Sequence, residues 1–195
     1  MTAALDRTFG HPRGLMGRVG GAMMARGNAA TELHVVNLAK PGPEEAVLVV
    51  GPGPGVGLVA AAARARQVTG VDPSDGMLRL CRSRCTSAGF DGVELRAGSA
   101  SATGQAAGSV DMVLTVNNVA LWPDRAAGFT ELLRVLRPGG RLVLSAHERW
   151  LPVARHDLAA EAEAAGFTDL QTWVWDPPGF GASRAAQLRA YRPAG

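Results

Sequence analysis

Residues 46–57 read Ala46-Val47-Leu48-Val49-Val50-Gly51-Pro52-Gly53-Pro54-Gly55-Val56-Gly57, and this stretch decides the fold. Its first half is apolar, uncharged and rich in β-branched residues, which predicts a short buried strand. Its second half has glycine at every second position, where the backbone turns sharply and a ligand can approach more closely than a Cβ atom allows. In α/β sheets, ligands bind at the carboxyl ends of the strands. The stretch therefore predicts a nucleotide-type crevice.

The spacing of the glycines distinguishes this loop from other nucleotide-binding loops. The third glycine of a G-x-G-x-x-G fingerprint would fall on Val56 or Leu58. A P-loop needs a lysine directly after its glycines, but the only lysine, Lys40, precedes them. A short-chain dehydrogenase would need a Tyr-x-x-x-Lys pair, and Tyr191 stands at the opposite end of the chain from Lys40. The P-loop and dehydrogenase interpretations therefore fail.

Apolar runs alternate with helical patterns along the rest of the chain. The expected strands are Val47–Val50, Val68–Asp72, Val93–Ala97, Val110–Val116, Arg141–Ala146, Phe167–Trp175 and Ala186–Tyr191. The expected helices are Val56–Arg66, Ser74–Ser87 with Ser74 as its N-cap, Asp124–Leu136 stopped by Pro138-Gly139-Gly140, and Pro152–Ala165. This alternation predicts an α/β fold with a mostly parallel sheet and helices on both faces.

The first 40 residues contain no strand pattern. Leu15–Met24 and Ala29–Leu38 read as two helices, which would form either a lid beside the ligand crevice or an extra layer over the sheet. With no repeat or linker, we expect a single domain over residues 1–195. It would consist of a helical preface or lid (1–40), a ligand-binding core (45–150) and the C-terminal part of the sheet (151–195).

Composition bounds the class of protein. At 195 residues, 47% of them hydrophobic, the chain fits one globular domain and is too short for a Rossmann domain plus a substrate domain. The N-terminus shows no basic segment followed by an apolar run, so we expect no secretory signal, no membrane span and a cytoplasmic location. Cys81 and Cys85, the only cysteines, make no disulfide framework, which fits a reducing compartment.

Charge and histidine placement argue against two kinds of ligand. The net charge is +3, and no basic run with interleaved aromatic residues occurs, so we expect no nucleic-acid partner. His11, His34, His147 and His156 have no recognised ligand spacing, so we expect no metal. The sequence does not indicate an oligomeric state.

Asp72 ends the second expected strand, 17 residues after Gly55. A carboxylate at this place can accept two hydrogen bonds from the vicinal hydroxyls of a ribose, which points to an adenosine-type ligand. The alternative is a solvent-exposed turn aspartate in Asp72-Pro73-Ser74, because Asp-Pro pairs initiate turns.

Four motifs now carry a family resemblance: VLVVGPGPGVG (47–57), TGVDPSDGML (69–78), SVDMVLTVNNVALWPD (109–124) and LLRVLRPGGRLVLS (132–145). In order and spacing they resemble class I S-adenosylmethionine-dependent methyltransferases, most of all the small bacterial ones grouped with ubiquinone and menaquinone methyltransferases. The similarity covers roughly residues 45 to 150. It implies a Rossmann-like, seven-stranded sheet of order 3-2-1-4-5-7-6 with the last strand antiparallel, and S-adenosylmethionine as cofactor.

The resemblance also implies a cofactor site along the carboxyl ends of the strands. Gly51, Gly53 and Gly55 would line the methionine moiety, Asp72 would hold the ribose, Pro73 and Met77 would lie near the adenine, Ser99 and Ala100 would flank its ring, and Asn117 would face the methyl donor. Two positions depart from the family pattern. The family usually has Asp or Glu where Val49 stands and Asp where Ser99 stands.

Methyl transfer from a sulfonium needs positioning above all, and a general base only for acceptors with an acidic proton. His147 is the best candidate base, with Asn117 beside the donor; the alternative for His147 is a loop histidine at a strand end. Asn28, Asn118 and Trp122 are candidate acceptor contacts, although Asn118 can instead organise its turn and Trp122 can be buried packing.

We therefore expect an enzyme that methylates O, N or C of a small, partly apolar metabolite. Val49 and Ser99 motivate an alternative from another class, a methyltransferase-fold protein that binds the cofactor weakly and catalyses a cyclisation or isomerisation. The sequence carries no motif for the acceptor.

Overall fold

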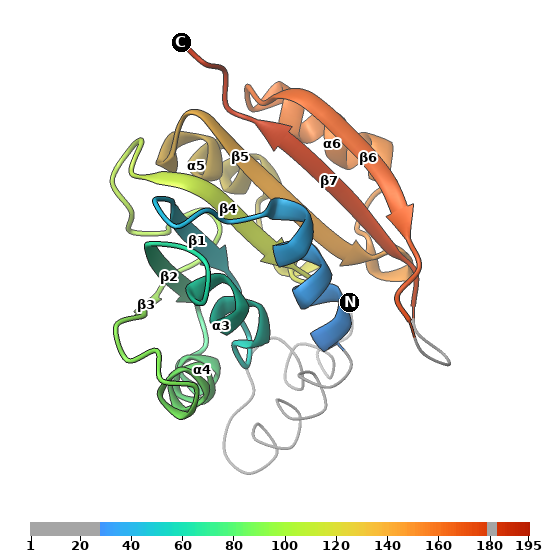
Figure 1. The fold of residues 1–195 in the computed structure, drawn as a ribbon. Coiled ribbons are helices and arrows are strands. Elements are labelled where there is room, and N and C mark those ends of the chain that lie inside the picture. Colours follow the sequence, from blue (N-terminus) through green and yellow to red (C-terminus); the bar gives the residue numbers. More distant parts are fainter. Residues whose placement is uncertain (1–27, 179–182) are drawn as a thin grey trace.

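A computed structural model describes residues 28–178 and 183–195, and its seven strands form one sheet in the order β3-β2-β1-β4-β5-β7-β6 (Figure 1). The strands are β1 (Ala46–Val50), β2 (Gln67–Asp72), β3 (Glu94–Ala97), β4 (Val110–Val116), β5 (Leu136–His147), β6 (Thr168–Trp175) and β7 (Ala185–Tyr191). Strands β1 to β5 pair in parallel, and β7 pairs antiparallel with both β5 and β6. The predicted α/β fold and strand order are confirmed.

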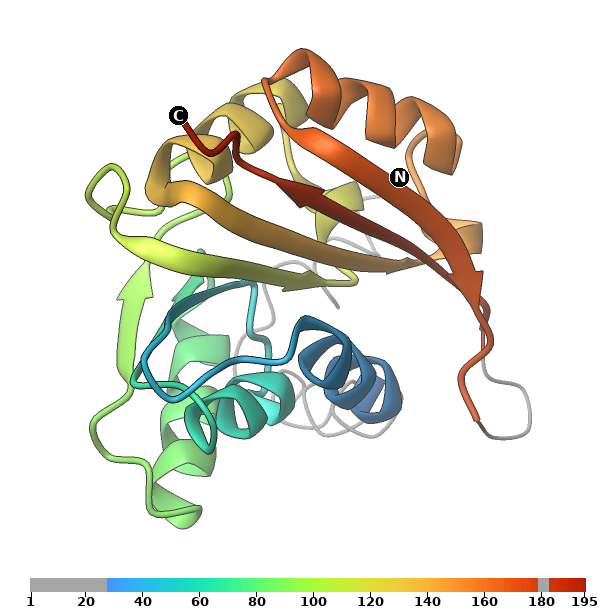
Figure 2. The same ribbon diagram turned by 45° about the horizontal axis from the view of Figure 1, so that its top comes forward.

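Helices cover both faces of this sheet (Figure 2). They are a helix over residues 28–39, α3 (Val56–Ala62), α4 (Asp75–Ser87), α5 (Arg125–Val135) and α6 (Arg155–Ala164), with short 3-10 turns η2 (Val119–Leu121) and η3 (Glu148–Trp150). One core cluster joins the sheet to α5 and α6, and the other joins it to α3, α4 and the helix over 28–39. Neighbouring residues of β1 enter opposite clusters, Leu48 and Val50 the first, Val47 and Val49 the second, because side chains alternate across a strand.

The Pro138-Gly139-Gly140 segment is not the helix stop that we expected. Helix α5 already ends at Val135, and β5 begins at Leu136 and includes the segment. Gly139 donates its backbone N–H to Arg192 O at 3.0 Å, and Arg192 N donates to Gly140 O at 2.8 Å. Pairing with the C-terminal residues therefore makes this segment part of the strand.

Two helices are shorter than the sequence pattern predicts. Helix α3 ends at Ala62 rather than at Arg66. Arg66 and Gln67 instead donate their backbone N–H groups to Glu45 O, at 3.0 and 3.3 Å, which brings the chain to the start of β2 beside β1. Helix α6 begins at Arg155 rather than at Pro152. The expected N-cap of α4 is confirmed, since Ser74 Oγ accepts from Met77 N at 3.3 Å.

The helix over residues 28–39 packs flat against the sheet (Figure 2). Val35 and Val36 are buried against β1, and His34 stacks on Trp175 of β6 with ring centroids 3.8 Å apart. Residues 28–39 therefore form a layer over the sheet, and a lid role of the preface stays a prediction. The helix expected over Leu15–Met24 lies outside the described residues.

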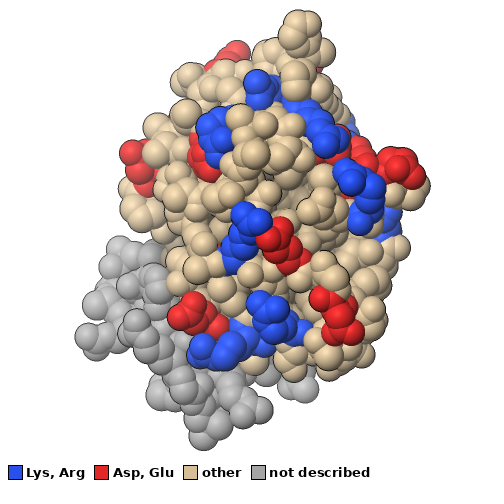
Figure 3. Space-filling model, turned by 90° about the vertical axis from the view of Figure 1, so that its left-hand side faces the viewer, with Lys and Arg blue, Asp and Glu red and all other residues tan. Residues whose placement is uncertain are grey.

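The face of the molecule shown in Figure 3 carries basic and acidic side chains interspersed with one another. Arg137 pairs with Asp111 at 2.7 Å, and Arg134 pairs with Glu131 at 2.6 Å. Within residues 28–178 and 183–195, no helix is long and apolar enough to cross a membrane, and no group of three His, Cys, Asp or Glu residues lies together as a metal site would require.

Candidate active site

The loop between β1 and α3 folds back on itself through left-handed glycines. Gly51, Gly53 and Gly55 have φ angles of 62°, 51° and 87°, a region that favours glycine. Gly51 N donates to Val71 O of β2 at 2.8 Å, and Gly55 is the N-cap of α3. A Cβ atom on Gly51 would collide with the Asn118 amide, whereas a Cβ atom on Gly53 would meet nothing within 4 Å. The loop is thus packed at Gly51 and open at Gly53.

Asn118 fixes the loop from the side of β4. Its Nδ2 donates to Val50 O at 2.7 Å, and its Oδ1 accepts from Thr115 Oγ1 at 2.6 Å and from Trp122 Nε1 at 2.9 Å. The whole amide is therefore engaged within the chain. This favours the turn-organising alternative for Asn118, and contact with an acceptor stays a prediction.

Replacing Asn118 by alanine should destabilise the fold by about 2–4 kcal/mol, because the partly buried Val50 carbonyl, Thr115 hydroxyl and Trp122 N–H would all lose a partner. Urea unfolding measures the loss. Asn37→Ala is the matched control, since the exposed Asn37 makes one surface hydrogen bond, to Arg64, and should change stability by less than about 0.5 kcal/mol. Equal effects of the two changes would contradict this role of Asn118.

Asp72 lies at the carboxyl end of β2, beside the glycine loop. It is only 6% exposed, and its Oδ1 accepts from Ser74 N at 2.8 Å. Asp72 thus makes a turn hydrogen bond, but it is buried and not the solvent-exposed aspartate of that alternative. The ribose contact stays a prediction, and a carboxylate has more than one acceptor position for it. Pro73 is exposed, and Met77 is buried on the first turn of α4.

The loop after β3 returns to the end of β2. Gly98 N donates to Asp72 O at 3.3 Å, so Ser99 stands next to the Asp72 turn. Ser99 Oγ lies 3.2 Å from Ser101 Oγ, and Ala100 is buried in the same core cluster as Val71. These positions agree with an adenine-flanking role, which remains a prediction.

Three polar side chains predicted from separate parts of the sequence meet beyond the ends of β4 and β5. Asn117 Oδ1 accepts from the backbone N–H of His147 at 2.9 Å, and Asn117 Nδ2 lies 3.2 Å from His147 Nε2. Asn28 Oδ1, from the helix over residues 28–39, lies 3.2 Å from the same nitrogen. Asn117 has a φ of 56°, which is rare outside glycine and is tolerated best by Asn and Asp. The fold therefore brings Asn28, Asn117 and His147 into one cluster.

Burial and the nearby charge of Arg149 favour the neutral form of His147. Burial lowers the pKa of the imidazole, and a backbone hydrogen bond with Ser183 acts in the opposite direction. Asn117 Oδ1 accepts from the His147 backbone N–H, so the Asn117 amide nitrogen faces His147 Nε2 and is placed to donate to it in one tautomer, whereas Asn28 Oδ1 is placed to accept from Nε2 in the other. The Nε2 atom therefore points into the cluster, between an amide donor and an amide acceptor.

Trp122 contributes to packing at this edge. Its ring meets Phe129 of α5 edge-on, with centroids 5.5 Å apart. The ring also lies so close to Gly128 that a Cβ atom added there would be 2.7 Å from it. A role as a wall of the acceptor pocket stays a prediction.

Sequence reasoning missed Glu32. Its Oε2 accepts from Gly57 N of α3 at 2.7 Å, and the side chain is 8% exposed. Burial raises the pKa of this carboxyl to about 7, while the hydrogen bond from Gly57 and the charge of Arg84 act in the opposite direction. A signal existed, since Glu32, Val35, Val36 and Ala39 repeat at i, i+3, i+4 and i+7, and an acid therefore interrupts an apolar helical stripe.

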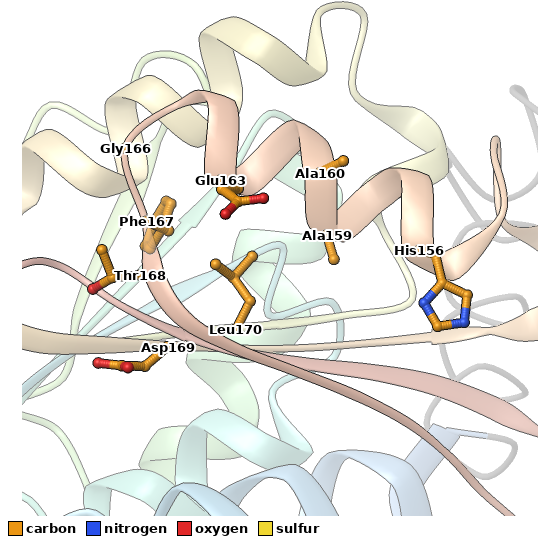
Figure 4. Close-up of a pocket in the computed structure, with 9 residues that line it drawn as sticks. All are labelled: His156, Ala159, Ala160, Glu163, Gly166, Phe167, Thr168, Asp169 and Leu170. Carbon is orange, nitrogen blue, oxygen red and sulfur yellow. The ribbon is translucent and has the colours of Figure 1, made fainter.

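A hollow lies away from these residues, between α6 and β6 (Figure 4). It is an open groove of about 620 Å³ lined by His156, Ala159, Ala160, Glu163, Gly166, Phe167, Thr168, Asp169 and Leu170. None of the predicted site residues lines it, and it belongs to the outer edge of the sheet.

Comparison with known families and proteins agrees with this arrangement. The family described as "Methyltransferase domain" matches residues 48–144. An uncharacterized methyltransferase of Bacillus subtilis, YdaC, is 29% identical over 161 residues, which are 78% of this chain and 87% of that protein.

Solved structures with low sequence identity share the fold. A phospholethanolamine N-methyltransferase 2 of Haemonchus contortus, in complex with phosphomonomethylethanolamine and S-adenosylhomocysteine, has a TM-score of 0.79 at 16% identity and covers 97% of this chain and 59% of that one. The [4+2]-cyclase SpnF has a TM-score of 0.72 at 16% identity over 86% of this chain and 82% of that one.

Proposed function

Because this chain belongs to the class I S-adenosylmethionine-dependent methyltransferases, we propose that it methylates an O, N or C atom of a small, partly apolar metabolite. The observation that carries the proposal is the meeting of four features at one edge of the sheet. They are the open glycine loop after β1, the buried Asp72 at the end of β2, Asn117 with its positive φ after β4, and His147 with its lowered pKa at the end of β5. The chain order reverses between β1 and β4, which is where ligands bind in such sheets.

The residues at this edge fit S-adenosylmethionine. Gly53 leaves open space where any other residue would have a Cβ atom, and three left-handed glycines let the backbone approach the methionine moiety. The buried Asp72 carboxylate matches the paired hydroxyls of a ribose. When bound, the cofactor supplies a methyl group on a positively charged sulfur.

The chain's own contribution is then to hold and orient the acceptor. Asn28, Asn117 and His147 present amide and imidazole groups that can fix a polar acceptor atom. His147 Nε2 is the group that can take up the acceptor's proton, in exchange for its hydrogen bond with Asn117. Leu121 and Trp150, on the short turns that follow β4 and β5, are 39% and 48% exposed, and we propose them as contacts for apolar parts of the acceptor.

Two measurements test the function. Calorimetry should detect binding of S-adenosylmethionine and S-adenosylhomocysteine to the full chain. A panel of small apolar alcohols, amines, carboxylic acids and activated carbon acids should then yield S-adenosylhomocysteine together with a product that is heavier by one methyl group. Absence of binding at millimolar cofactor would overturn the proposal. Conversion of a panel compound without methylation, with the cofactor bound, would instead favour the cyclisation or isomerisation alternative.

Replacing His147 by glutamine should lower kcat about a hundredfold for an acceptor that loses a proton, because glutamine cannot take up that proton. The rate of the wild-type chain should fall as the pH drops through the lowered pKa of His147, and this fall should vanish in the variant. His156→Gln is the matched control, since His156 is exposed on α6. An unchanged pH profile in the His147 variant would assign His147 to loop structure alone.

A further inference from the structure

Glu32 is a buried acid outside the predicted cofactor and acceptor contacts. It comes from the helix over residues 28–39 and contacts the first turn of α3, directly after the glycine loop. A Cβ atom on Gly57 would lie 3.2 Å from Glu32 Cβ and 3.3 Å from Glu32 Oε2. The glycine at position 57 therefore allows this carboxylate to contact the first turn of α3, next to the glycine loop.

The groups around Glu32 come from three elements. Arg84 of α4 donates its Nε to Pro54 O of the loop at 2.8 Å and acts on Glu32 through its charge. Cys81 of α4 fills the space beside Gly55, where an added Cβ would lie 2.6 Å from its Sγ. Burial raises the pKa of the Cys81 thiol, and Cys85, Asp72 and Glu32 act in the same direction. Two carboxylates, Asp72 and Glu32, thus reach the region of the Gly51–Gly55 loop.

A helix cap alone does not explain a carboxylate at this position. Among the described residues, Gly57 N is the one hydrogen-bond donor to Glu32, and no cation forms an ion pair with it within 4 Å. A buried charge without a paired cation is costly, and a neutral glutamine oxygen would accept the same N–H. The acid is therefore accounted for best by a cationic group that joins the site from outside the chain.

We propose that Glu32 is a cofactor-binding residue, whose ionised carboxylate balances the cationic amino-acid end of S-adenosylmethionine at the Gly51–Gly55 loop. This inference rests on the proposed function. It also accounts for Val49. The side chain of Val49 packs in the core cluster that contains Val35 and Val36. The helix over residues 28–39 therefore covers Val49, which stands where the family usually has an acid, and the same helix carries Glu32.

The proposal links cofactor binding to a proton. Because burial raises the pKa of Glu32 to about 7, much of the free protein holds this proton slightly below neutral pH. A cation beside the carboxylate favours its ionised form, so cofactor binding should release the proton. Asp72, Cys81 and Arg84 face the same region, and they remain in every variant that tests Glu32.

Glu32→Gln keeps an acceptor for Gly57 N and removes the titration. The ratio of the wild-type affinity for S-adenosylmethionine to that of Glu32→Gln should rise about tenfold from pH 6 to pH 8. At pH 6 the affinities of the two proteins should be similar. Calorimetry at pH 6.5 in buffers of different ionisation enthalpy should show release of about three quarters of a proton by the wild type, because a pKa of about 7 leaves that fraction of Glu32 protonated, and none by Glu32→Gln. S-adenosylhomocysteine, which has the same amino-acid end, should show the same pattern.

Controls separate charge from structure. Glu44→Gln removes one exposed carboxylate before the start of β1 and should behave as the wild type. Glu32→Asp keeps the acid and should recover part of the proton release. Because the fold holds the Glu32 proton more tightly than the unfolded chain does, wild-type stability should fall as the pH rises from about 4.5 to about 7, and the Glu32→Gln fold should lack this fall.

The outcomes are distinct. Wild-type binding with no proton release, or with equal release by Glu32→Gln, would overturn the role of Glu32 and leave the proposed function standing. A loss of affinity in Glu32→Gln that is the same at pH 6 and pH 8 would make Glu32 a structural cap and overturn the inference. A wild-type chain that binds neither ligand would overturn the proposed function together with this inference.

Discussion

Gly51→Ala is expected to destabilise the fold by about 3–5 kcal/mol and to weaken cofactor binding about a thousandfold. An alanine at a φ of +62° costs about 1–2 kcal/mol. Its Cβ atom would also occupy the space of the Asn118 amide. Displacing that amide removes its hydrogen bond to Val50 O and unsettles the bonds from Thr115 and Trp122. Thermal unfolding and calorimetric titration with S-adenosylhomocysteine measure the two effects.

Gly53→Ala in the same loop is the matched control. Its φ of +51° gives a similar conformational cost, but its Cβ atom would meet nothing within 4 Å. We expect a stability loss of only about 1–2 kcal/mol, together with weaker cofactor binding because the new methyl group enters the open side of the loop. If the free energy of unfolding of Gly51→Ala were no lower than that of Gly53→Ala, packing against Asn118 would not stabilise the glycine loop.

Asp72→Ala is expected to weaken binding of S-adenosylmethionine and S-adenosylhomocysteine about a thousandfold. Two hydrogen bonds to a charged acceptor, each worth about 1.5–3 kcal/mol, would be lost from the ribose. The carboxylate also accepts from Ser74 N, so the alanine variant loses part of the turn that starts α4. Calorimetry measures the affinity, and circular dichroism reports on the fold.

Asp72→Asn separates the two roles. Its side-chain oxygen still accepts from Ser74 N, while the charge and one acceptor are gone, so we expect an affinity loss of about tenfold with the fold retained. Asp91→Ala, at an exposed turn, should change neither quantity. Equal affinities for wild type and Asp72→Ala would remove Asp72 from the cofactor site.

Much of the fold follows from local patterns. The uncharged run at Ala46–Val50 and the alternation of strands and helices predicted an α/β fold, and the four motifs resembled a family whose strand order the structure has. The errors lie at element ends. The segment Pro138-Gly139-Gly140 reads as a helix stop, but it pairs with residues near the C-terminus, and a local pattern holds no information about so distant a partner.

The candidate site was predicted unevenly for the same reason. Gly51 and Asp72 follow strands that can be recognised from sequence, so their common edge could be predicted. Asn28, Asn117 and His147 were singled out separately, but their meeting depends on the packing of the helix over residues 28–39 beside β4 and β5. Whether they bind an acceptor is still a prediction.

The sequence by itself determined the buried strand Ala46–Val50, the glycine turn after it and the alternation of strands and helices, because these follow from short, local patterns. The order of the strands was predicted only through the family resemblance, because strand pairing joins segments that are distant in the chain. Only the tertiary structure decided which charge lies behind the glycine loop. Val49 suggested that a carboxylate was missing, yet Glu32, 25 residues before Gly57 in the chain, accepts a hydrogen bond from Gly57 N. Burial and electrostatic environment arise only when distant segments pack together, so the position of this acid and its raised pKa could not be read from the glycine loop alone.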